Sequence, residues 1–112
     1  MDTPTALAAL AALAQESRLA VFRLLVQAGP EGMAASRIAE GLSIAPSSLS
    51  FHLKELSHAG LLGSRQDGRF VIYAANVDAM NGLVGFLTEN CCGGQPCGVA
   101  APTACVPAKR TT

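Results

Sequence analysis

The chain has 112 residues, enough for one compact domain with a modest core. Half of the residues are hydrophobic, yet there is no Trp, one Tyr and four Phe, so the core must consist mostly of aliphatic side chains. Eight Lys and Arg balance eight Asp and Glu, and this zero net charge argues against a protein that binds nucleic acid through a generally basic surface. Any such binding must come from a local basic patch, or from a dimer that doubles one.

The N-terminal sequence predicts no export. Asp2 precedes the first apolar run, and no basic residue does. A secretory signal would have basic residues there. The run from Ala6 to Ala14 is too short to span a bilayer. We therefore expect a cytoplasmic protein, and in a reducing compartment its four cysteines favour metal ligands or sensors over structural disulfides.

A first helix is predicted to begin at Thr3-Pro4, with Thr3 as the N-cap and Pro4 as the first helical residue. Leu7, Leu10 and Leu13 follow at intervals of three, with alanines at most of the positions between them. A helix with almost no charge in so small a protein indicates a subunit interface.

A second helix is expected from about Glu16 to Ala28, because Gly29-Pro30 ends it. We expect its inward side chains to be Leu19, Phe22, Leu25 and Val26, and its outward ones to be Arg18 and Arg23.

A third helix, from about Ala34 to Gly41, is expected to turn Ile38 and Leu42 toward the core and Arg37 toward solvent.

A short turn, Ser43 to Pro46, then leads into a fourth helix that ends at Gly60. Leu49, Leu53 and Leu56 stand at i, i+4 and i+7, so they form one apolar stripe that faces a core. The opposite side carries Ser47, Phe51, Lys54 and His58, with Ser48 and Ser50 on the flanks. An ordinary surface helix has such a pattern too. Two helices joined by about four residues, the second with this polar face, have the layout of a helix-turn-helix that enters the DNA major groove.

The period changes after Gly60. The segments Leu61 to Gln66 and Phe70 to Ala75 have the character of short strands, and Asp67-Gly68 between them is the strongest signal for a two-residue hairpin turn. Arg65 and Arg69 flank this turn. A solvated hairpin would explain the arginines alone, but after a helix-turn-helix the hairpin is interpreted as a wing that reaches an adjacent groove or phosphates.

A last helix is predicted from about Val77 to Asn90, with an apolar stripe made by Met80, Leu83, Val84 and Leu87, and with Phe86 beside it. No later element is predicted to cover this stripe, so we expect it to pair with its copy in a second subunit. We interpret residues 98–112 as a flexible tail. The predicted fold is a mainly α winged helix-turn-helix with a small β-hairpin over residues 1–97, a homodimer through its terminal helices.

The segment from about Leu13 to Tyr73 resembles the ArsR/SmtB family of winged-helix repressors. The matching pieces are LAQESRLAVFRLL, IAEGLSIAPSSLSFHLKELSHAGLL and SRQDGRFVIYA, in order and with matching gaps. The resemblance implies a cytoplasmic homodimer that binds operator DNA and dissociates when a metal, a metalloid or another inducer binds.

The DNA contacts of that family map onto Ser47, Ser48, Ser50, Phe51, His52, Arg65 and Arg69 of this chain. Arg37 and Lys54, which the helical pattern turns outward, complete the candidate DNA-binding set. Phe51 departs from the polar residue often found at its position, and is expected either to contact a thymine methyl or to pack. His52 is expected either to be a packed, hydrogen-bonded structural residue or to contact a phosphate or a base.

Two sensor sites of the family do not fit this chain. The arsenic site in the helix before the recognition helix needs a cysteine cluster, whereas Met33-Ala34-Ala35-Ser36 stands there. The zinc site on the last helix needs histidines, and the two histidines of the chain, His52 and His58, lie elsewhere. The cysteine group at the end of the last helix remains.

Cys91, Cys92 and Cys97 place three thiols within the seven residues CCGGQPC. Adjacent residues of a helix project about 100° apart, so Cys91 and Cys92 cannot both bind one ion within a regular helix. Asn90 and the two glycines after the cysteine pair provide the means of ending the helix, because Asn and Gly tolerate left-handed conformations. The two thiols can then converge, and the Gly-Gly-Gln-Pro turn can return Cys97 to them.

Soft thiolates without nitrogen or oxygen partners select soft metal centres. Structural zinc prefers four ligands, commonly in C-x-x-C pairs. Adjacent cysteines do not fit that pattern, although Cys105 offers a fourth thiolate.

Arsenite condenses with three thiols, with loss of three waters, to a neutral trigonal-pyramidal adduct. Antimonite behaves in the same way, and monomethylated As(III) needs two thiols. A few family members place an arsenic site at the end of this helix, and the cluster of Cys91, Cys92 and Cys97 resembles theirs. Another metal, or a redox pair of Cys92 and Cys97, stays open as an alternative.

We therefore predict a dimeric repressor that binds operator DNA with empty thiols and dissociates when As(III), Sb(III) or methylated As(III) binds, with no organic cofactor. Two rival classes remain. One is a winged helix that binds proteins instead of DNA. The other is a small thiol reductase. Two observations argue against it: no basic residue neighbours the cysteines in the sequence to lower a thiol pKa, and no companion acid–base group is evident.

Overall fold

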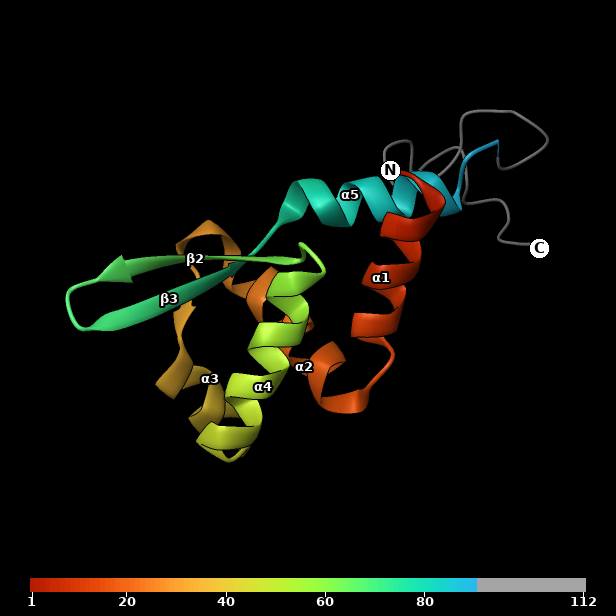
Figure 1. The fold of residues 1–112 in the computed structure, drawn as a ribbon. Helices are drawn as coiled ribbons and strands as arrows, with labels where there is room; N and C mark the ends of the chain where they lie inside the picture. Colours follow the sequence, from red (N-terminus) through yellow and green to blue (C-terminus); the bar gives the residue numbers. More distant parts are fainter. Residues whose placement is uncertain (91–112) are drawn as a thin grey trace, which may run out of the picture.

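The computed structural model describes residues 1–90 (Figure 1). Its helices are α1 (Thr3–Leu13), α2 (Glu16–Ala28), α3 (Ala35–Leu42), α4 (Pro46–His58) and α5 (Val77–Leu87), with a short 3-10 helix η1 (Gly29–Glu31) after α2. Its strands are β1 (Met33–Ala34), β2 (Leu62–Asp67) and β3 (Phe70–Ala75). In Figure 1 the β2–β3 hairpin projects from one side of the helices, and α5 runs back across the top toward the N-terminal end of α1. This part of the chain is a winged helix-turn-helix, as predicted.

Helix α1 begins one residue earlier than its predicted cap implies. The N-cap is Asp2, whose carboxylate accepts a hydrogen bond from the backbone N–H of Thr5 at 2.9 Å, so the prediction of Thr3 as N-cap is wrong. A carboxylate satisfies a free N–H group and also interacts favourably with the helix dipole. The hydrogen bonds from Thr5 lower the pKa of the Asp2 carboxyl.

The protomer core lies where α1, α2, α3 and α4 meet. The largest fully buried side chains are Leu25, Ile38, Leu49, Leu56, Leu61 and Val21. Helix α1 contributes its alanines Ala6, Ala9 and Ala12 to this core, whereas Leu7 is 60% exposed and Leu10 38% exposed. The small alanine side chains bring α1 close to its neighbours and turn the leucines outward.

Helix α2 has the predicted bounds, but its inward face is rotated from the predicted one. Phe22 and Leu25 are buried as expected, and Val21, which the sequence analysis did not select, is fully buried. Leu19 and Val26 are 44% and 36% exposed, so the prediction that they point inward is wrong. A sequence pattern shows that a helix is amphipathic but not which of its apolar edges the other helices cover.

Arg18 is not the solvated residue that the helical pattern predicts. Its Nε donates a hydrogen bond of 2.7 Å to the carbonyl oxygen of Ala12, near the C-terminal end of α1, and the side chain is partly buried. The C-terminal carbonyls of a helix lack partners within the helix, and a cation there also complements the helix dipole. Arg18 therefore joins the end of α1 to the start of α2.

The sheet has a third strand that the sequence analysis missed. The strand order is β1-β3-β2, and both pairings are antiparallel, with Met33 opposite Tyr73 and Ala34 opposite Ile72. A strand of two residues is too short to show an alternating pattern.

The turn of the hairpin is shifted by one residue. Asp67 pairs with Phe70, so the turn consists of Gly68 and Arg69 rather than Asp67-Gly68. Gly68 has a φ of 63°, in the left-handed region that a glycine adopts without strain. Helix α5 ends at Leu87, three residues before the predicted Asn90, and Asn90 itself has a left-handed φ of 59°. No helix within residues 1–90 is long and apolar enough to cross a membrane.

Gly32→Ala is expected to destabilise the protein by about 2 kcal/mol or more, because Gly32 has a φ of 70° and its added Cβ would overlap the backbone carbonyl of Tyr73 on β3. The matched control is Gly41→Ala in α3, where a Cβ meets nothing within 4 Å. That control should be neutral or stabilise the protein by up to about 1 kcal/mol, because alanine is the better helix former. Urea unfolding of both variants measures the two effects, and equal free energies of unfolding for Gly32→Ala and the parent would contradict this account.

Candidate nucleic-acid interface

The candidate interface is built around α4, which three buried leucines fix in the molecule. Leu49, Leu53 and Leu56 are 1%, 3% and 0% exposed, which confirms the predicted apolar stripe. The turn before α4 is equally well held, because Ser43 caps α3 with a left-handed φ of 54° and the N–H of Ile44 donates to the carbonyl of Ala39 at 3.0 Å. A helix anchored in this way presents a fixed outer face.

That outer face carries the residues predicted for it, which are polar except for Phe51. Ser47, Ser48, Ser50, Phe51, Lys54 and His58 are exposed, as the helical pattern predicted. The N-cap residue of α4, Ala45, makes no side-chain cap hydrogen bond. The N–H groups of the first turn of α4 are therefore not capped by that side chain, and the positive end of the helix dipole there favours an anion such as a phosphate.

His52 lies at the edge between the outer face of α4 and the core. It is half-buried, and its Nδ1 is buried with no hydrogen-bond partner among the described residues. Its ring meets the ring of Phe51 edge-on, with centroids 5.8 Å apart and an interplanar angle of 64°. The structure thus shows a packed histidine without the hydrogen bond that one of the two predictions assumed.

The arginines of the wing differ in their surroundings. Arg65 lies on β2 opposite Ile72, and its guanidinium donates a hydrogen bond of 3.0 Å to the carbonyl oxygen of Glu31 in η1. Arg69 lies in the turn itself and is exposed. One donor of Arg65 is therefore used to hold the wing against η1, whereas Arg69 is placed at the tip.

Arg37 is exposed on α3, as predicted. Figure 1 shows α3 and the first turns of α4 at the lower edge of the molecule, with the hairpin projecting beside them and α1 and α5 on the other side. The hairpin, α3 and the first turns of α4, which carry most of the predicted DNA-binding residues, therefore lie away from α1 and α5.

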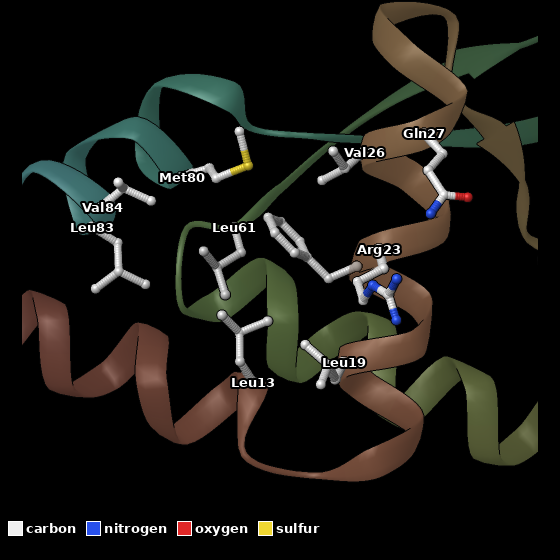
Figure 2. Close-up of a pocket in the computed structure, with 10 residues that line it drawn as sticks. Leu13, Leu19, Arg23, Val26, Gln27, Leu61, Met80, Leu83 and Val84 are labelled. Carbon is white, nitrogen blue, oxygen red and sulfur yellow. The ribbon is translucent and has the colours of Figure 1, made fainter. Parts of the chain in front are cut away.

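A second surface feature is an apolar pocket of about 320 Å³ between α1, α2 and α5 (Figure 2). Its lining residues are Leu13, Leu19, Phe22, Arg23, Val26, Gln27, Leu61, Met80, Leu83 and Val84. Figure 2 shows Leu13 of α1, Leu19 of α2 and Leu83 of α5 directed toward the same hollow. The misassigned Leu19 and Val26 of α2 belong to this pocket, which explains why they are exposed.

Further apolar side chains are exposed on the same helices. Leu10 and Leu7 lie one and two turns before Leu13 on α1, and Leu87, which is 58% exposed, lies at the end of α5. Apolar side chains grouped in this way mark a surface that another protein surface covers. A subunit interface was predicted for α1 and α5 alone, whereas the exposed apolar side chains of α2, Leu19 and Val26, line the same pocket.

The start of α5 is hydrogen-bonded to two of the residues that connect α4 to β2. The amide Nδ2 of Asn76 donates to the carbonyl of Gly60 at 3.0 Å, and its Oδ1 accepts from the N–H of Ala79 at 3.2 Å, which caps α5. The backbone N–H of Asn76 also donates to the carbonyl of Leu61 at 2.8 Å. The sequence analysis did not select Asn76, although an Asn just before a helix is a recognisable N-cap signal.

The predicted thiol site, Cys91, Cys92 and Cys97, lies outside the described residues, as do Cys105 and the predicted tail 98–112. Within residues 1–90, no three His, Cys, Asp or Glu side chains lie close enough together to hold a metal ion.

Comparisons with known proteins agree with this geometry. A family model described as a helix-turn-helix domain matches residues 13–65. The chain is 36% identical over 77 residues to the uncharacterized HTH-type transcriptional regulator YceK of Bacillus subtilis, a match that covers 68% of this chain and 76% of the relative.

Two solved structures extend the comparison. An ArsR-like transcriptional regulator from Rhodococcus sp. RHA1 superimposes with a TM-score of 0.69 at 27% identity, covering 77% of this chain and 78% of that chain. A protein described as a possible transcriptional regulator for arsenical resistance superimposes with a TM-score of 0.62 at 26% identity, covering 71% and 80% of the two chains.

Proposed function

The chain belongs to the ArsR family of winged helix-turn-helix transcriptional regulators, and we propose that it is a homodimeric repressor whose operator complex is released by As(III) or Sb(III). Its relatives are DNA-binding regulators of transcription and not enzymes, and this excludes the thiol reductase considered above. In the proposed cycle the protein binds operator DNA while Cys91, Cys92 and Cys97 are free, and dissociates when they bind the metalloid.

The outer face of α4 is the observation that carries the DNA-binding part of the proposal. Exposed hydroxyl groups and the Lys54 ammonium lie on a helix whose opposite face is fixed by buried leucines. Side chains of this kind contact base edges and phosphates in the major groove, while Arg69 at the wing tip suits an adjacent phosphate or groove.

Arg69→Ala is expected to weaken binding to a fragment of the protein's own promoter and to reduce its dependence on salt. Each phosphate contact contributes about −0.9 to the slope of log K against log salt, so loss of one contact from each protomer should reduce the slope by about 2. Arg23→Ala removes the same charge from the pocket side of the molecule, and protein that sedimentation equilibrium shows to be dimeric should have an unchanged slope. Fluorescence anisotropy at several salt concentrations measures both slopes. Equal slopes for Arg69→Ala and the wild type would contradict the contact, and no binding to the fragment would indicate a protein-binding module instead.

The homodimer is supported by the apolar surface around the pocket. A protomer that stood alone would expose Leu7, Leu10, Leu19, Val26 and Leu87 to water. A second copy that places its own α1 and α5 against this surface would bury these side chains and fill the pocket with apolar groups. It would also provide two recognition helices, which compensates for the small number of basic residues in one protomer.

The thiol site is supported by its chemistry and by the way in which α5 ends. The prediction required the helix to end before the cysteines so that adjacent thiols can converge, and α5 does end at Leu87, with Asn90 in the left-handed region. Three thiolates suit a trigonal-pyramidal As(III) centre. The similarity to a protein described as a possible regulator for arsenical resistance is in keeping with this inducer.

A route for the signal follows from the contacts of α5. The metalloid would bind just beyond the end of α5, whose start is hydrogen-bonded through Asn76 to Gly60 and Leu61, two of the residues that connect α4 to β2. Release requires the metalloid to bind the state with low DNA affinity more tightly than the state with high DNA affinity. A 100-fold loss of operator affinity corresponds to a coupling free energy of about 2.7 kcal/mol, which a shift of α5 relative to α4 and to the subunit interface would have to supply.

A further inference from the structure

The outer face of α4 contains one large apolar side chain among polar ones. Phe51 is 55% exposed, whereas the three leucines of the same helix are buried. It lies one turn after Ser47 and Ser48 and three residues before Lys54, in the part of α4 that the proposed function places in the major groove. A phenyl ring held in water at this position gains free energy only when a partner covers it.

The structure excludes the packed alternative for Phe51. The ring lies outside the hydrophobic core, and its described aromatic contact is the edge-on one with His52. Because His52 is half-buried and its imidazole meets the phenyl ring, one side of the phenyl ring contacts the protein. The other side of the ring remains available to a ligand.

We propose that Phe51 is a specificity-determining residue that recognises the 5-methyl group of thymine. In the major groove thymine presents a methyl group where cytosine presents a hydrogen, and a phenyl ring has no hydrogen-bonding group with which to recognise any other base edge. The neighbouring serines can donate to or accept from several bases, so they discriminate less. This inference rests on the proposed binding of operator DNA.

The expected discrimination follows from the burial of one methyl group. Burial of one apolar carbon contributes about 0.8 kcal/mol, so the contact of the methyl group with the ring should tighten binding about fourfold per half-site. A dimer with one such contact in each half-site should bind DNA that carries the methyl groups about 15-fold more tightly than DNA that lacks them, because the two contributions multiply.

The test uses two versions of a promoter fragment, one synthesised with thymine and one with uracil, which lacks only the 5-methyl group. The wild-type protein is expected to bind the thymine fragment about 15-fold more tightly. Phe51→Ala is expected to bind both fragments equally, with the affinity that the wild type has for uracil DNA. Lys54→Ala, a neighbour whose contacts need no methyl group, should bind both fragments more weakly and keep the ratio of the wild type.

A ratio for Phe51→Ala equal to that of the wild type would overturn the inference, and so would a wild type that binds both fragments equally tightly. In either case DNA binding is observed, so the repressor proposal stands. A wild type that binds neither fragment would overturn both proposals. Phe51→Leu, which keeps an apolar side chain, should retain part of the preference for thymine and thereby show that the effect comes from apolar contact.

Discussion

Leu10→Glu is expected to separate the protein into monomers and to weaken operator binding by about 100-fold or more. Leu10 is 38% exposed on α1, one turn before Leu13 of the apolar pocket, so the substitution leaves the protomer core intact. In the dimer the new carboxylate would be buried without a partner, which costs several kcal/mol. A monomer binds a single half-site, and loss of the second set of contacts accounts for the weaker binding. Sedimentation equilibrium measures the first effect, and anisotropy with promoter DNA the second.

Ala8→Glu provides the matched control on the same helix. Ala8 lies on the other side of α1, in a groove that it shares with Arg18, Glu55 and His58 of α2 and α4. The same charge placed there is expected to leave the dimer and its DNA affinity unchanged. If Leu10→Glu remained dimeric at micromolar concentrations, the subunit interface would have to lie elsewhere.

Cys92→Ser is expected to leave operator binding intact and to raise the arsenite concentration that releases it. The proposed site needs three thiolates, and a serine hydroxyl does not replace one, because it is not deprotonated near neutral pH and As(III) is a soft centre. The remaining thiols Cys91 and Cys97 would hold the metalloid by two bonds at most. We expect the arsenite concentration for half-release to rise by about 100-fold, which corresponds to a free energy of about 2.7 kcal/mol.

Cys105→Ser is the control for this prediction, since Cys105 is excluded from the proposed site. It should respond to arsenite as the wild type does. A wild-type response in Cys92→Ser, or a lost response in Cys105→Ser, would show that the ligands have been assigned wrongly. Release of wild-type protein by peroxide and not by arsenite would point to a redox pair of Cys92 and Cys97.

The helical part of the fold was largely predictable because its signals are local. The spacing of Leu49, Leu53 and Leu56 defined the inner face of α4, and Gly29-Pro30 defined the end of α2. The errors arose where the outcome depends on contacts between distant residues. Strand β1 exists because two residues meet β3, and no local pattern marks so short a strand.

The orientation of helices in the assembled core was likewise not predictable. Leu19 and Val26 have the same character as Phe22 and Leu25, and they differ only in which side of α2 the other helices cover. The hairpin turn moved by one residue because the register between β2 and β3 places Asp67 opposite Phe70.

For the candidate DNA interface, the outward residues of α4 followed from the helical period alone, whereas the partners of individual side chains did not. The hydrogen bond from Arg65 to Glu31 joins residues 34 positions apart, and the edge contact between Phe51 and His52 depends on the packing of His52. Asn76 shows the same limit: its N-cap role is local, but its bond to Gly60 at the end of α4 required the tertiary structure.

The most direct test of the proposed repressor is a fluorescence-anisotropy measurement on the preformed complex of wild-type protein and its own promoter DNA, to which arsenite is added under reducing conditions. We expect the anisotropy to fall to the value of free DNA once arsenite saturates the thiol sites, and zinc not to reproduce this fall. A complex that forms but keeps its full anisotropy at excess arsenite and antimonite would contradict the metalloid response. Failure to form any complex would contradict the repressor itself.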